Sequence, residues 1–82
     1  MWFVYVLINQ DSTRIYIGMS QNVEQRIATH NSGKVFSTQF YIPWRLIQVE
    51  EFSDSKTARV REKYLKSGYG KMWLKKKFLT EG

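Results

Sequence analysis

The sequence predicts an α/β fold, more narrowly an α+β fold, in which a sheet is flanked by helices. Residues 2–8 form an apolar run that is rich in β-branched and aromatic side chains, two further extended segments follow it, and helical segments separate or follow these. The first run is apolar at both odd and even positions, which is typical of a central strand covered on both faces. We therefore expect helices on both sides of the sheet.

The second extended segment covers residues 14–18. It follows a cluster of turn-forming residues at positions 9–13. Two extended segments joined by such a cluster indicate a β-hairpin. This hairpin would place Tyr5 and Tyr16 on adjacent strands.

A first helix is expected after the hairpin. Ser20 or Asn22 can cap its start, and it should end near residues 31–33, where asparagine, serine and glycine follow one another. Arg26 and His30 are one helical turn apart and lie at the edge of the predicted buried stripe. Both side chains should therefore be close to the sheet surface.

Residues 32–43 are predicted to form a long loop, a kind of segment that often carries function. Residues 44–52 then form a third strand, which is less apolar than the first and should lie nearer an edge. Ser53 or Asp54 can cap a second helix that runs to about residue 67, where Gly68 is suited to the position after the helix end. A basic helix over about residues 70–79 follows.

Length and composition restrict the class of protein. A chain of 82 residues holds one core, so we expect a single domain over residues 1–82. It has no cysteine, which excludes disulfides, thiolate metal sites and thiol nucleophiles and is compatible with the cytoplasm. The longest apolar run is too short to span a bilayer and does not resemble a signal peptide. We expect a cytoplasmic protein without a membrane partner.

The charge distribution points to a polyanionic partner. The net charge is +6, and nine of the thirteen basic residues follow position 55, where the only acids are Glu62 and Glu81. A positive field favours encounter with nucleic acid, although lysine-rich helices are often merely solvated. The candidate nucleic-acid-binding residues are Lys34, Lys63, Lys66, Lys71 and Lys75.

Glu62 is the most informative acid. Ala58, Glu62 and Leu65 share one helix face by their four- and three-residue steps, which would turn a carboxylate inward. A competing stripe through Val60 and Tyr64 would instead turn Glu62 to solvent, where it would pair with a neighbouring basic side chain. The periodicity leaves both arrangements open.

An inward carboxylate needs a compensating partner, and a divalent cation shared with a nucleic-acid phosphate is one. The other acids cannot complete a protein-held metal cage, because Glu50 and Glu51 face opposite sides of a strand and the rest are isolated. Magnesium tolerates such a site, since it keeps several waters and takes one or two carboxylates. Phosphodiester hydrolysis also needs a phosphate clamp and a proton acceptor, for which Arg26 and either His30 or a nearby tyrosine are candidates.

These residues together resemble the GIY-YIG nuclease family. The resemblance rests on Phe3-Val4-Tyr5, Tyr16-Ile17-Gly18, Arg26 with His30, and Glu62, in that order and in the matching elements. The stretch at residues 31–34 before Pro43-Trp44 looks like the small stand-alone bacterial members, and the resemblance covers essentially the whole chain.

The resemblance implies a three-stranded antiparallel sheet flanked by helices, with a site on one sheet face. It implies a single divalent ion, Mg²⁺ or Mn²⁺, held by Glu62, and no organic cofactor. Tyr16 would act as general base and Tyr5 would hydrogen-bond within the site, while Arg26 would clamp the phosphate and His30 would support a tyrosine or the substrate.

The chain also departs from the family pattern. Phe3 and Val4 replace the glycine and isoleucine of the first tripeptide. Many members place an asparagine after the glutamate, whereas this chain has none beyond Asn31, which leaves that role empty or taken by Lys71 or another lysine.

Three functions are compatible with these observations. The first is a metal-dependent endonuclease, for which DNA is favoured over RNA as the substrate and a structural feature over a long sequence. The alternative is a catalytically weak or inactive nucleic-acid-binding module with the same fold. A third is a protein-interaction domain that uses the aromatic loop residues Phe36, Phe40 and Tyr41.

Overall fold

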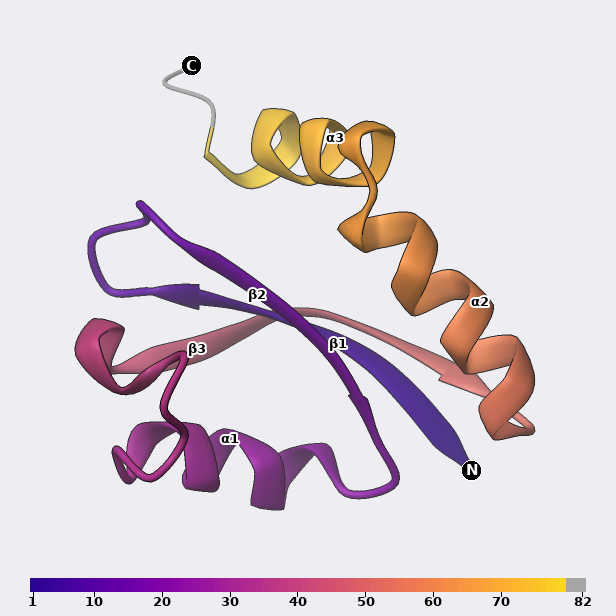
Figure 1. The fold of residues 1–82 in the computed structure, drawn as a ribbon, viewed down its shortest axis with the longest axis horizontal. Coiled ribbons are helices and arrows are strands. Elements are labelled where there is room, and N and C mark those ends of the chain that lie inside the picture. Colours follow the sequence, from indigo (N-terminus) through magenta and orange to yellow (C-terminus); the bar gives the residue numbers. More distant parts are fainter. Residues whose placement is uncertain (80–82) are drawn as a thin grey trace.

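The computed structural model describes residues 1–79, so Glu81 lies outside the described part of the chain. Its centre is a three-stranded antiparallel sheet of β1 (Trp2–Asn9), β2 (Ile15–Ser20) and β3 (Trp44–Phe52) in the order β2-β1-β3 (Figure 1). The first strand is therefore central and the third lies at an edge, as predicted. The expected α+β class with a three-stranded antiparallel sheet is confirmed.

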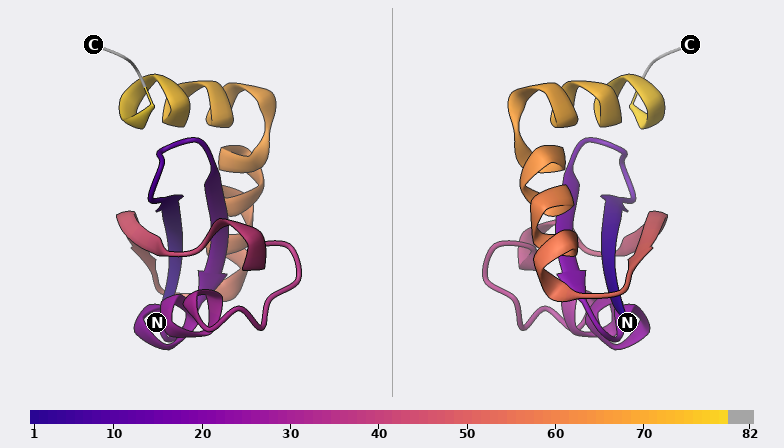
Figure 2. Two further views of the ribbon diagram at one scale, coloured as in Figure 1. Left: turned by 90° about the vertical axis from the view of Figure 1, so that its left-hand side faces the viewer. Right: turned by 90° about the vertical axis from the view of Figure 1, so that its right-hand side faces the viewer.

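Helices cover both faces of this sheet, as the apolar pattern of β1 predicted. The helix α1 (Val23–Asn31) lies on one side, and α2 (Ser55–Lys66) and α3 (Gly68–Phe78) lie on the other (Figures 1 and 2). A short 3₁₀ turn, Gln39–Tyr41, interrupts the loop between α1 and β3. None of the described helices has the length and apolar character that a membrane crossing requires.

The side chains of β1 alternate between two separate clusters, because successive residues of a strand point to opposite faces. On the side of α2 and α3, Val4 and Val6 pack with buried side chains of both helices, Leu65 and Leu74 among them. Complete burial of one such leucine contributes about 1.5–3 kcal/mol. On the side of α1 the buried members are Tyr5, Leu7 and Trp44. The second cluster is the smaller and the more aromatic of the two.

The caps of α1 and α2 are set by local hydrogen bonds. The side chain of Asn22 accepts from the backbone N–H of Gln25 at 3.0 Å, so Asn22 and not Ser20 is the N-cap of α1. Asp54 caps α2 by accepting from the N–H of Thr57 at 2.7 Å. After α1 the chain passes through Gly33 at φ +81°, a left-handed conformation that favours glycine. The predicted helix ends near residues 31 and 67 are confirmed to within one residue.

The junction between α2 and α3 is tighter than expected. Gly68, predicted to lie beyond a helix end, begins α3 directly, and Ser67 caps both helices, so α3 starts two residues before the predicted position 70. Gly70 is buried, and a Cβ atom there would collide with the backbone of Tyr64 and Leu65. The absence of a side chain at Gly70 therefore lets α3 turn closely across the end of α2.

Candidate active site

The hydroxyl of Tyr5 is the centre of the candidate site. Tyr5 lies on the central strand opposite Gly18 of β2, and its side chain is 1% exposed. A Cβ atom built on Gly18 would lie 2.5 Å from Tyr5 Oη and 3.1 Å from Cε2 of Tyr16. The end of the Tyr5 ring therefore lies over Gly18, in space that any other residue at position 18 would fill. Gly18 was part of the recognised tripeptide, but this steric role could not be read from the sequence.

The helix α1 brings Arg26 and His30 to this hydroxyl. His30 is fully buried, and its Nε2 lies 3.3 Å from Tyr5 Oη. The pKa of Arg26 is raised, first by its interaction with Tyr5 and to a smaller extent by Tyr16. The rings of Tyr16 and His30 have centroids 4.6 Å apart. Four of the five predicted catalytic residues are thus close together on the α1 face of the sheet.

Burial raises the pKa of Tyr5 above its ordinary value. The hydrogen bond from Arg26 opposes this effect, and the negative charge of Glu62 adds to it. Tyr5 is therefore a neutral hydrogen-bonding group at pH 7. The effect of Glu62 is the smallest of these, because Glu62 is on α2, which packs on the sheet face opposite α1. The structure therefore does not bring Glu62 into contact with the four clustered side chains.

Burial lowers the pKa of His30, and the positive charge of Arg26 lowers it further. The Nδ1 atom of His30 lies 2.9 Å from Oγ1 of Thr38, which is itself 1% exposed. The hydroxyl of Thr38 can donate to the carbonyl oxygen of Val35 at 3.5 Å. Every group is satisfied when Nδ1 donates to Thr38 and Nε2 accepts the proton of Tyr5. His30 is then a neutral acceptor aimed at the Tyr5 hydroxyl.

Thr38 was not among the residues predicted for the site. It is held in place by Trp44, whose indole N–H donates to the carbonyl oxygen of Thr38 at 3.0 Å. The start of β3 is in turn fixed to α1, because Asn31 hydrogen-bonds to both the N–H and the carbonyl oxygen of Trp44. The only signal in the sequence was that Thr38 falls in the long loop expected to carry function.

Tyr16 is half-buried and thus more accessible than Tyr5. The two tyrosine rings are tilted by 35° with centroids 6.3 Å apart. Tyr16 also makes an edge contact with Trp44 at 6.4 Å. These contacts fix the ring, while its partial exposure leaves the phenol within reach of a substrate.

Glu62 faces inward on α2. It is 8% exposed and shares the buried face with Ala58 and Leu65, whereas Val60 and Tyr64 are 67% and 49% exposed. The competing stripe through Val60 and Tyr64 is therefore wrong.

Two basic side chains nevertheless pair with the Glu62 carboxylate. One oxygen lies 3.3 Å from Nε of Arg59 and the other 3.2 Å from Nζ of Lys66. Those side chains are 61% and 49% exposed, so each can swing into solvent, and exposed ion pairs contribute only about 0.2–1 kcal/mol.

The acidic side chains of the described residues suit a metal ion only if a single carboxylate holds it. Among residues 1–79 no group of three histidine, cysteine, aspartate or glutamate side chains is placed to hold one. Magnesium needs only one or two carboxylates when water and substrate phosphate complete its coordination. Glu62 fits that requirement, because it is a buried carboxylate whose present partners are weakly held.

The predicted nucleic-acid-binding lysines are all exposed but come from three segments. Lys34 follows α1, Lys63 and Lys66 lie on α2, and Lys71 and Lys75 lie on α3. Lys71 lines a pocket with Ile15 and Ile17. These isoleucines point to the sheet face opposite Tyr16, so the structure does not place Lys71 among the four clustered side chains.

In the aromatic loop, Phe36 and Phe40 are 81% and 76% exposed, whereas the half-buried Tyr41 packs beside Trp44. Two of the three aromatic residues considered for a protein interface are thus accessible.

The fold and this cluster define the class of protein. The GIY-YIG catalytic domain model matches residues 1–77, and the chain belongs to the GIY-YIG family, which is a family of nucleases that act on nucleic acid and generally use a divalent metal ion. The resemblance stated from the sequence is confirmed.

Within that family the chain is similar to small proteins named UPF0213. It is 38% identical to a UPF0213 protein of Natronomonas pharaonis, over 79% of this chain and 76% of the relative. It is 39% identical to one of Staphylococcus haemolyticus, over 79% of each. The solution NMR structure of a UPF0213 protein from Bacillus halodurans has a TM-score of 0.53 and 32% identity, covering 90% of this chain and 82% of that one.

Proposed function

We propose that this protein is a single-domain, cytoplasmic endonuclease that hydrolyses phosphodiester bonds in DNA with the aid of Mg²⁺ or Mn²⁺. We further propose that it selects a structural feature rather than a long sequence. The observation that carries the proposal is the convergence of Tyr16, Arg26 and His30 around the Tyr5 hydroxyl, with Glu62 buried on α2 as the candidate metal ligand.

The roles of the side chains follow from this geometry. Arg26 remains charged at any working pH and can bind two phosphate oxygens through its planar donors. Tyr16 is half-buried and would serve as the general base, its phenolate taking a proton from the attacking water, with Arg26 beside it. Tyr5 keeps its proton and, with His30, positions the guanidinium.

Glu62 would hold the divalent ion after Arg59 and Lys66 move aside. When bound, such an ion supplies positive charge that polarises the phosphate and offsets the charge developing in the reaction. Arg59 and Lys66 would then be free to contact the DNA backbone on either side. Their exposure supports this exchange of partners.

The test is a cleavage assay with purified protein, Mg²⁺ and supercoiled, nicked, branched and single-stranded DNA. Glu62→Ala and Tyr16→Phe should abolish cleavage. The matched controls Glu24→Ala and Tyr69→Phe change exposed residues of the same types and should cleave like the wild type. Cleavage that survives both site variants would come from a contaminant and would refute the proposal.

The binding-module alternative has one observation in its favour, which is that Glu62 already has two basic partners. It predicts DNA binding with a steep salt dependence and no product at any Mg²⁺ or Mn²⁺ concentration. The same protein preparations distinguish the two functions, since only an endonuclease yields product that disappears with chelator.

A further inference from the structure

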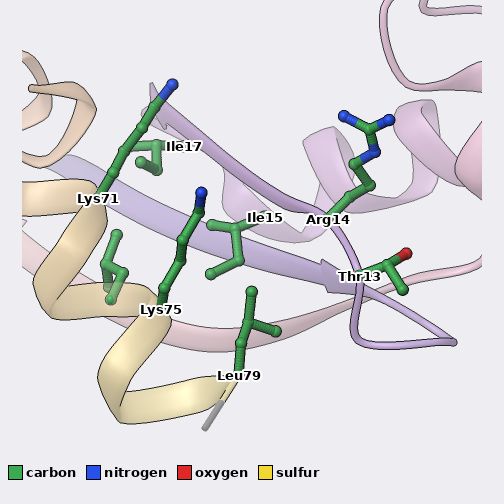
Figure 3. A pocket seen from close by; sticks show the side chains of 8 residues that line it. Thr13, Arg14, Ile15, Ile17, Lys71, Lys75 and Leu79 are labelled. Carbon is green, nitrogen blue, oxygen red and sulfur yellow. The ribbon is translucent and has the colours of Figure 1, made fainter. Parts of the chain in front are cut away.

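A pocket of about 170 Å³ lies between the edge strand β2 and α3 (Figure 3). Ile15, Ile17 and Leu74 form an apolar floor, and Lys71 and Lys75 border it. The two isoleucines flank Tyr16 in the strand and point to the other sheet face. The pocket and the tyrosine site therefore lie on opposite faces of the same strand.

The charge of this pocket is unbalanced. Figure 3 shows the Lys71 and Lys75 side chains extending side by side past Ile17 and Ile15, whereas Arg14 points away from them. Arg14 instead lies 4.7 Å from the centre of the Tyr41 ring. No acid is among the residues 1–79 that line the pocket, and within that part of the chain neither lysine ammonium has an ion-pair partner.

Two like charges one helical turn apart disfavour a helix, and a bound anion would relieve their repulsion. The pocket thus offers two ammonium groups beside an apolar floor, which suits a ligand that carries an anionic group on an apolar frame. A nucleotide within a nucleic-acid strand has this composition, with a phosphate next to the carbon atoms of a sugar. Charge complementarity therefore favours nucleic acid as the occupant.

We propose that this pocket binds a nucleotide of the substrate strand that flanks the phosphate at the tyrosine site. Lys71 and Lys75 contact its phosphate, and the partly buried Ile15 contacts its sugar above the buried Ile17. In the described sheet no further strand covers the outer edge of β2, so a nucleic-acid strand can pass around that edge from Tyr16 to α3. This inference rests on the proposed function, because it takes DNA as the ligand.

The first test measures affinity for a fluorescein-labelled DNA duplex in EDTA, between about 50 and 200 mM salt. Each phosphate neutralised in a duplex contributes about 0.9 to the slope of log K against log salt. Lys71→Gln and Lys75→Gln should together reduce the slope by about 0.9–1.8. The control Lys56→Gln removes an equal charge from an exposed position of α2 and should leave the slope unchanged.

The second test locates the DNA by NMR of isoleucine methyl groups. Ile15 and Ile17 report on the pocket, and Ile27 reports on the α1 face, where it packs near the tyrosines. The duplex should shift the methyl signals of Ile15 and Ile17, and the Lys71→Gln/Lys75→Gln double variant should reduce those shifts. Signals that move only at Ile27 would overturn the pocket proposal.

The outcomes separate this proposal from the proposed function. Wild-type protein that cleaves DNA while the lysine variants keep its salt slope overturns the pocket and leaves the nuclease intact. Protein that never cleaves DNA but shows the reduced slope and the shifted Ile15 and Ile17 signals overturns the nuclease and supports the pocket. Protein that binds no DNA at low salt overturns the pocket proposal as well.

Discussion

Replacing Gly18 with alanine tests whether the space beside Tyr5 matters for the site. The new Cβ atom would lie 2.5 Å from Oη and 2.7 Å from Cζ of Tyr5, and 3.1 Å from Tyr16. Ordinary contacts begin near 3.4 Å, so the end of the Tyr5 ring must move by about 0.9 Å. Tyr5 is 1% exposed and cannot relax into solvent.

The size of the effect follows from this displacement. Overpacking of a well-packed core costs about 1–3 kcal/mol, and each kcal/mol lowers Tm by about 4–8 °C in a domain of this length. A misplacement near 1 Å in a catalytic arrangement can reduce the rate about 10²-fold. We therefore expect Gly18→Ala to lower both Tm and the rate of DNA cleavage.

Thermal unfolding and single-turnover cleavage measure the two effects. Gly68→Ala is the matched control, because a Cβ atom at Gly68 meets nothing within 4 Å. Tyr5→Phe removes the closest contact of Gly18→Ala but also leaves Nε2 of His30 without a partner, so the double variant should lose less Tm than the sum of the two single losses. A Gly18→Ala protein with the Tm and cleavage rate of the wild type would show that the ring does not occupy this space.

Three further changes test other parts of the structure. Thr38→Val should lower the free energy of unfolding by about 1–3 kcal/mol in urea titrations, because it leaves Nδ1 of His30 without a partner. Thr38→Ser keeps the hydroxyl and should retain most of the wild-type free energy of unfolding. His30 is the only histidine and has a lowered pKa, so below about pH 6.5 the unfolded chain binds more protons than the native one. The free energy of unfolding should therefore fall as pH drops through this range. The variant His30→Gln should remove this pH dependence. Gly70→Ala should lower Tm more than Gly68→Ala, since its Cβ meets the α2 backbone; equal Tm values would contradict the tight helix junction.

Most of the fold could be predicted because its signals are local. The uninterrupted apolar run of β1 required cover on both faces, and the turn-forming residues before β2 required a hairpin. The caps were less certain, since Ser20 and Asn22 are chemically equivalent candidates for α1. Only the geometry, with Asn22 accepting from Gln25, decides between them. The position of Gly68 misled the helix boundary because Ser67 can serve two helices at once.

The site was predictable only in part, because its remaining features depend on tertiary contacts. The orientation of Glu62 was ambiguous from periodicity, since two overlapping stripes of apolar residues fit α2. Thr38 reaches His30 from an irregular loop, and no spacing rule predicts such a contact. The roles proposed for Tyr16 and Arg26 stay predictions until the variants are measured.

The opposite placement of α1 and α2 has a consequence for how activity arises during synthesis. Ribosomes deliver the chain from its N-terminus, so Tyr5, Tyr16 and Arg26 emerge well before Glu62. The helix that carries Glu62 packs on a sheet whose last strand, β3, immediately precedes it. If the proposed function holds, an interrupted translation product that ends before α2 lacks the acid and also the helices that cover one face of the sheet, so it has neither the metal ligand nor a complete core.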